Sequence, residues 1–233
     1  MVRPFSFVCF AAAFTAVGVT GNGQSTSDWL IVPGKRIGPV TGGATRADLV
    51  RFFGAKRVDD DYVSTGRDTE PEVGTIVNGD DPGAELHILW NEDKPEPHVA
   101  FVAICPGAAD VSAGCRWHTA EGITIGTTLK ALEKLNAGPF KLMGMGSDRG
   151  GVVVSFSGGR LERLRPLRGC IGLQLEEGAG EPTPERAAWL DQIEADREFL
   201  SSHPAMQRIN PNVQWMTFSF EPCEETGPPH PSQ

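Results

Sequence analysis

The sequence lacks the features by which several functional classes are recognised. Its 21 Lys and Arg residues are outnumbered by 30 Asp and Glu, giving a net charge of −9, whereas nucleic-acid-binding surfaces usually need a basic excess. It contains no GxSxG, HExxH, GxxxxGKS or GxxxxGKT motif, so a serine hydrolase, a zinc protease and a P-loop protein have no support. It also has no CxxC pair, which argues against a thiol oxidoreductase. With no His at ligand spacing from any Cys either, we expect no metal site. We also expect no cofactor.

No apolar run reaches the roughly 20 residues that span a bilayer. The apolar run of residues 5–19 carries no charge and follows Arg3, and no acidic residue precedes Asp28. This layout is typical of a signal peptide, which we assign to residues 1–23. We therefore expect an exported protein, periplasmic or extracellular, with no stable membrane span after cleavage. An uncleaved anchor, or lipidation at Cys9, remains the alternative.

Export affects the interpretation of the cysteines. Four remain after cleavage, and an even number in an exported chain predicts two disulfides. We favour Cys105–Cys115, which closes a short loop, and Cys170–Cys223. Four buried free thiols are the alternative.

An internal repeat divides the chain. Residues 40–55 (VTGGATRADLVRFFGA) and 123–138 (ITIGTTLKALEKLNAG) share four identities at an offset of 83. The repeat predicts two tandem units, 24–110 and 111–222.

Each copy of the repeat predicts a short capped helix. Thr45 and Thr128 are placed to cap the first turns, and Asp48 completes a capping-box pattern after Thr45. Gly54 and Gly138 are placed to end the helices.

Strands are predicted around these helices, which gives an α+β fold of two short-helix plus antiparallel-sheet units. Apolar and β-branched residues predict strands at 74–78, 84–90, 98–104, 140–143, 152–156, 170–175 and 213–220. One longer helix is expected at 184–200, capped by Thr183 with Pro184 at its first position. We expect a flexible tail at 223–233.

The second copy resembles the β-lactamase-inhibitor-like module, of which the small lipoproteins of outer-membrane assembly carry a similar unit. The matching residues are Ile123, Gly126, Thr128, Leu132, Leu135, Gly138, Pro139 and Phe140. The chain is also similar to a family of exported bacterial proteins without assigned function, through residues 122–151. The resemblance implies a scaffold for protein–protein contact, not an activity.

Candidate contact residues come from a glycine-rich loop and from tryptophans. Residues 144–159 hold six glycines around Asp148 and Arg149, which a presented loop would offer to a partner. Trp90 and Trp117 are candidate anchors, because aromatic residues dominate interface energetics. A tight hairpin and ordinary core packing are the respective alternatives.

The leading hypothesis is a non-enzymatic binding module of the bacterial envelope whose partner is another envelope or secreted protein. Its charge is uneven, with net −10 over residues 59–96 and +5 over residues 116–168, and such fields steer association. The competing hypothesis is an envelope hydrolase that uses His118, Asp148 and Arg149. A third is a structural protein that contacts only its own copies, since the sequence leaves the oligomeric state open.

Overall fold

The computed structural model describes residues 28–66, 69–93, 96–106, 108, 114–147, 149–166, 168–178, 183–194 and 196–222. The predicted signal peptide and the tail at 223–233 lie outside these ranges. The described residues form four α-helices and thirteen strands in three sheets. This confirms the predicted α+β class.

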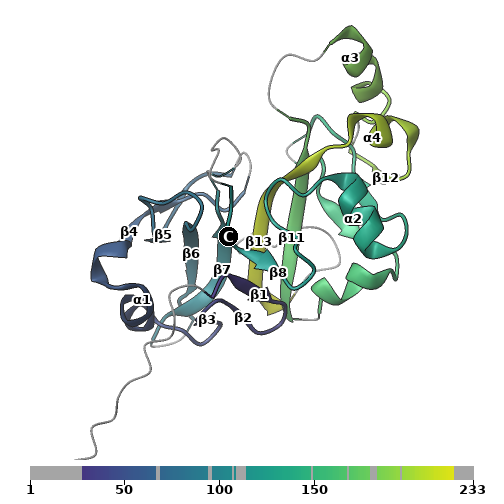
Figure 1. Cartoon of the computed structure of the whole chain (residues 1–233). Coiled ribbons are helices and arrows are strands. Elements are labelled where there is room, and N and C mark those ends of the chain that lie inside the picture. The colour runs from purple at the N-terminus through teal and green to yellow at the C-terminus, as the bar shows by residue number, and fades with distance from the viewer. Residues whose placement is uncertain are drawn as a thin grey trace, which may run out of the picture.

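The largest sheet has six antiparallel strands in the order β11-β13-β7-β6-β5-β4. The strands are β4 (Val58–Val63), β5 (Glu72–Val77), β6 (Leu86–Asn91), β7 (His98–Ile104), β11 (Arg168–Glu176) and β13 (Asn212–Pro222). Figure 1 shows β4, β5 and β6 on one side of the molecule and β13 and β11 on the other. The pairing of β13 with β7 crosses the boundary predicted between 110 and 111. The two units of the sequence analysis are therefore joined in one sheet.

Two smaller sheets flank this one. The first has the order β3-β2-β1-β8, with β1 (Leu30–Val32), β2 (Arg36–Ile37), β3 (Val40–Thr41) and β8 (His118–Thr119). The second has the order β10-β9-β12, with β9 (Lys141–Met143), β10 (Val153–Ser155) and β12 (Glu198–Leu200). The β1–β8 pair is parallel and joins the N-terminal described segment to the start of the second predicted unit.

The two repeated helices form where the capping residues predict them. Helix α1 (Arg46–Phe53) begins at Thr45, which exchanges both hydrogen bonds of a capping box with Asp48, and ends at Gly54. Helix α2 (Leu129–Asn136) begins at Thr128, but its left-handed terminal residue is Ala137, one position before the predicted Gly138. A short 3-10 helix, η1 (Ala55–Arg57), follows α1, and η3 (Arg160–Leu164) follows β10.

The predicted long helix at 184–200 is wrong. Helix α3 spans only Pro184–Leu190, and β12 occupies its predicted last turn. Phe199 pairs with Leu142 of β9 and is 9% exposed, whereas Leu200 is 49% exposed. Strand pairing therefore overrides the helical spacing of the apolar residues. A further helix, α4 (Pro204–Ile209), lies where none was predicted.

The main core lies on one face of the six-stranded sheet. It joins Ile88, Val102 and Phe218 of the sheet to Leu49 of α1 and Leu132 of α2. The opposite face carries a smaller cluster of Val63, Leu89, Phe101 and Ala103. None of the helices in the described ranges has the length and apolarity needed to cross a membrane.

One predicted disulfide is confirmed. Cys105, directly after β7, bonds to Cys115 with their Cα atoms 5.9 Å apart. Cys170 on β11 is also disulfide-bonded, and its predicted partner Cys223 lies outside the described residues.

Candidate functional site

The glycine-rich loop packs its backbone against the main sheet. Gly150 donates to the carbonyl of Ser147 at 2.7 Å, and a Cβ added at Gly151 would lie 1.8 Å from the carbonyl oxygen of Leu175 on β11. Arg149 is exposed in this turn, and Asp148 lies outside the described residues. The structure therefore explains the glycines by close backbone packing and leaves Arg149 at the surface.

Trp117 does not offer a contact surface. Its side chain is 1% exposed, and its indole N–H donates to the carbonyl of Ala84 at 3.0 Å. Its ring packs edge-on against the ring of Trp29, with the two ring centroids 4.8 Å apart. It also fills the space in which a Cβ at Gly38 would stand. Trp117 is a core residue, which corrects its prediction as an anchor, because non-local packing covers it.

The residues of the competing hydrolase hypothesis lie in different elements. His118 is exposed on β8, with Nδ1 2.8 Å from the carbonyl oxygen of Arg116, and Arg149 lies in the turn between β9 and β10. The disulfide with Cys105 removes Cys115 as a nucleophile beside His118.

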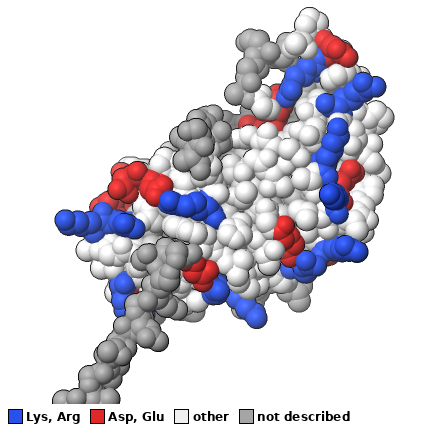
Figure 2. All heavy atoms as spheres, in the orientation of Figure 1, with Lys and Arg blue, Asp and Glu red and all other residues white. Residues whose placement is uncertain are grey.

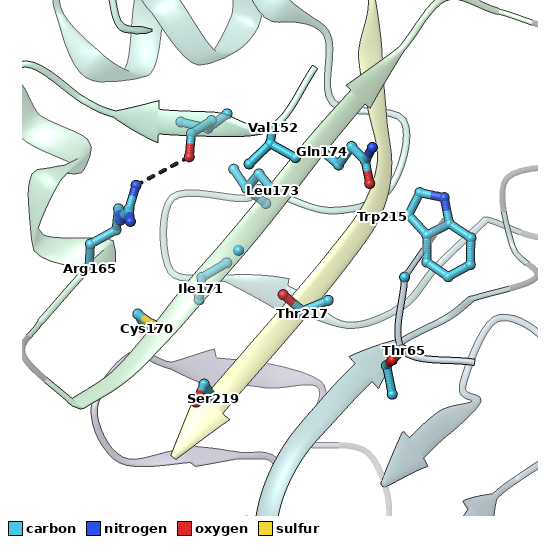
Figure 3. Close-up of a pocket in the computed structure, with 13 residues that line it drawn as sticks. Thr65, Val152, Arg165, Cys170, Ile171, Leu173, Gln174, Trp215, Thr217 and Ser219 are labelled. Carbon is cyan, nitrogen blue, oxygen red and sulfur yellow. Dashed lines mark hydrogen bonds between the residues drawn. The ribbon is translucent and has the colours of Figure 1, made fainter. Parts of the chain in front are cut away.

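A small cavity lies against β11 and β13, on the face that Figure 3 shows. It is lined by Thr65, Gly66, Val152, Val153, Arg165, Cys170, Ile171, Gly172, Leu173, Gln174, Trp215, Thr217 and Ser219. Its volume is about 50 Å³, against roughly 300–1,000 Å³ for pockets that hold small organic ligands. It has room for water at most, since one water occupies roughly 30 Å³ in the liquid.

Two polar side chains of this cavity are engaged with backbone carbonyls. The Arg165 guanidinium donates to the carbonyls of Val153, at 3.2 Å, and Val154. The Gln174 amide donates to the carbonyl of Gly150 at 2.9 Å. Both side chains fix the β9–β10 hairpin to its surroundings, so the cavity is structural.

The more promising site is an exposed apolar face at the other end of the sheet. Tyr62 on β4 is 66% exposed, and Val73, its direct partner on β5, is 72% exposed. Trp90 on β6 is partly buried against the core, and its indole N–H forms a hydrogen bond with Thr75 on β5. Thr75 and Val73 are two positions apart on one strand, so their side chains point to the same face of the sheet. We call Tyr62, Val73 and Trp90 the β4–β6 face.

Hydrogen bonds hold this face in place. The Trp90 indole N–H donates to Thr75 Oγ1 at 3.0 Å, and that hydroxyl donates to Asp60 Oδ1 at 2.9 Å. Arg46 of α1 donates through Nε to the same carboxylate at 2.8 Å. The Arg46 guanidinium, helped by Thr75 and opposed by burial, holds the pKa of Asp60 below its usual value. The chain of bonds fixes the Trp90 ring from the helix side.

Acidic residues surround the β4–β6 face. Asp59, Asp60 and Asp61 are exposed on β4, and Glu70 is exposed just before β5. Figure 2 shows acidic side chains gathered over the β4–β5 end, with basic side chains beside them. Elsewhere in this view Lys and Arg gather over α2 and α4. No set of three or more His, Cys, Asp or Glu among the described residues is placed to hold a metal ion.

Sequence reasoning found one residue of this face and missed two. Trp90 was a candidate anchor, but no strand was predicted over Val58–Val63, where Tyr62 lies, and the predicted strand at 74–78 begins one residue after Val73. No alternation of apolar and polar residues marks this strand, because Val58 and Val63 are buried at its two ends with four exposed residues between them.

Comparison of the chain with protein-family models, curated proteins and solved structures finds no match. The assignment of function therefore depends on the chemistry of the face and of the cavities.

Proposed function

We propose that this chain is an exported, non-enzymatic binding module that contacts an envelope or secreted protein through the β4–β6 face. The observation that carries the proposal is the adjacent pair of exposed side chains, Tyr62 and Val73. Among the described residues, the other large exposed hydrophobic side chain is Leu200, on a different sheet.

The face has the composition of an interface centre. Fully burying an apolar side chain of this size contributes about 1.5–3 kcal/mol, and interface hot spots are enriched in Trp and Tyr. The bonds to Thr75 and Asp60 reduce the ordering cost of Trp90 on binding. The acidic surroundings favour a partner with a basic rim, because complementary charge speeds association.

Export is supported by the disulfides, which persist mainly in oxidising compartments. Cys105–Cys115 and the bonded state of Cys170 fit a periplasmic or extracellular location. The resemblance to β-lactamase-inhibitor-like modules is consistent with a contact scaffold and remains a prediction.

The test is affinity capture with crosslinking from native envelope and secreted fractions, with residues 24–233 as bait. Val73→Glu places a charge at the centre of the face, and Leu200→Glu is the matched control, since both side chains are exposed and apolar. Surface substitutions of this kind change folding stability by roughly 0.5 kcal/mol or less. We expect one dominant protein in near-stoichiometric yield, captured at least tenfold less by Val73→Glu and unchanged by Leu200→Glu.

Equal capture by both variants would contradict the β4–β6 face as the site. Failure of the unsubstituted chain to capture any protein would contradict the binding function itself. Capture of its own copies alone, with a mass that rises with concentration, would favour the structural hypothesis instead.

A further inference from the structure

A second, larger cavity lies where segments that are distant in the sequence meet. It takes Lys35 from the β1–β2 turn, Asn91 and Asp93 after Trp90, His98 at the start of β7 and Glu221 near the end of β13. Its volume is about 480 Å³, within the roughly 300–1,000 Å³ of small-molecule pockets. Its size therefore suits an organic ligand, unlike the cavity in Figure 3.

We propose that this pocket binds a small ligand through a cationic N–H group, an ammonium or a guanidinium. The proposal is independent of the protein contact proposed above, because it uses none of the residues of the β4–β6 face.

The chemistry of the lining favours a donor-rich cation. Glu221 and Asp93 carry carboxylates, which only accept hydrogen bonds when ionised. Among the lining side chains that the structure describes, Lys35 is the one with a fixed positive charge. Two carboxylates against one ammonium disfavour an anionic ligand. They favour a ligand that brings charged donors, because charge-assisted hydrogen bonds are about twice as strong as neutral ones.

The pocket is organised before a ligand arrives. Asn91 donates through Nδ2 to Glu221 Oε1 at 3.0 Å and accepts through Oδ1 from the Asp93 backbone N–H at 2.9 Å. Asn91 also pairs directly with His98 across β6 and β7. These bonds fix Glu221 at the pocket, so a bound cation would meet a carboxylate that needs little reordering.

Glycines let the segments around the pocket approach one another closely. Gly34 donates to the carbonyl of Gly169 at 2.7 Å, and a Cβ at Gly169 would stand 2.3 Å from the Gly34 Cα. Gly42 lies against the Phe220 ring, and a Cβ added at Gly42 would stand 2.8 Å from the Cδ1 atom of that ring. The three glycines therefore allow the segments to meet and leave backbone amides at the pocket as reporters.

The test compares three five-carbon probes that differ in their end groups: cadaverine with two ammonium groups, 1,5-pentanediol with two hydroxyls and glutarate with two carboxylates. Binding to residues 24–233 is followed by the NMR shifts of the Gly34, Gly42 and Gly169 amides. We expect saturable shifts with cadaverine, at least tenfold weaker binding of the diol and none of glutarate. Equal binding of the diol or of glutarate overturns the cationic class.

Variants separate the pocket from the general negative charge of the protein. Glu221→Gln removes one charge but keeps the oxygen that accepts from Asn91, and Glu185→Gln removes one exposed charge on α3. We expect cadaverine to bind at least tenfold more weakly to Glu221→Gln and equally well to Glu185→Gln. Equal losses in both variants, or no loss in either, overturn the site.

A further probe identifies the source of the cation. Binding of Nα-acetyl-lysine amide as well as cadaverine would assign a lysine side chain of a partner, and binding of cadaverine alone would assign a free diamine. Both results support the proposal.

Discussion

The side chain of Asn136 offers the sharpest test of how the second half of the chain is held together. It is 1% exposed at the end of α2. Its Nδ2 donates at 3.0 Å to the carbonyls of Gly138 and Phe156, and its Oδ1 accepts from the Leu161 backbone N–H at 3.1 Å. One amide thus joins the end of α2 to the residue after β10 and to η3.

The expected cost of Asn136→Ala follows from the groups it leaves unpaired. The Leu161 N–H is buried at its bond to Asn136 and would lose its partner, at a cost of about 1–3 kcal/mol for an unpaired buried group. The Phe156 carbonyl would keep its hydrogen bond from the Gly159 backbone N–H at 2.9 Å. The Gly138 bond is only partly buried and contributes less. The free energy of unfolding should therefore fall by about 2 kcal/mol, which lowers Tm by about 4–8 °C for a domain of this size.

Urea and thermal unfolding measure the loss, with Lys134→Ala on the exposed side of the same helix as the control. The control should stay within about 0.5 kcal/mol of the unsubstituted chain. Hydrogen exchange at the Leu161 amide should also speed up in Asn136→Ala alone. A loss below 1 kcal/mol, or unchanged exchange at Leu161, would refute the role of Asn136 as a buried bridge.

Two further predictions concern the disulfide and the bonds behind the β4–β6 face. Removing the bond between Cys105 and Cys115, which are 10 positions apart, by double substitution to Ala should lower the free energy of unfolding by about 3 kcal/mol, and an unchanged urea midpoint would contradict this. Asp60 has a lowered pKa in the folded state, so its ion pair stabilises the fold above its unfolded pKa, and this stability is lost as pH falls through the folded pKa. At pH 6 the free energy of unfolding of the unsubstituted chain should exceed that of Asp60→Asn by about 1 kcal/mol or less, because the ion pair is half-exposed. This difference, measured by urea titration, should shrink as the pH is lowered to 3. A constant difference would contradict the assignment.

The elements that the sequence predicts well are those fixed by neighbouring residues. The capping box of Thr45 and Asp48 needs only the spacing of two residues, and α1 forms where it indicates. The strands at 84–90 and 98–104 carry enough apolar residues to be recognised from their own segments, and β6 and β7 lie there.

The errors arise where distant partners decide the structure. Trp189, Ile193 and Leu200 have helical spacing. However, β9 pairs with the segment around Phe199 and makes it a strand. Trp117 is covered because β8 pairs with β1, almost 90 residues earlier in the sequence. The pocket at Glu221 depends on its bond to Asn91, 130 residues away. No local pattern carries such information.

The internal repeat shows how far a local motif determines a fold. Both copies give a Thr-capped helix of eight residues, yet the elements that follow differ. After α1 the chain forms β4, at the edge of the six-stranded sheet, whereas after α2 it forms β9, in the centre of a separate three-stranded sheet. The motif thus specifies the helix and its caps, and longer-range pairing decides where the next strand goes.

This shared sheet limits how independent the two halves can be. The edge of β7 pairs with β13 over Phe101–Ile104, so a first half alone would leave the backbone groups of a buried strand without partners. Open edges of apolar strands promote self-association. The acidic residues of β4 protect the outer edge of the sheet against this, because three exposed aspartates on one strand repel a second copy of themselves. The contact proposed for the β4–β6 face would therefore need the second half, whose β13 completes the sheet beside β7.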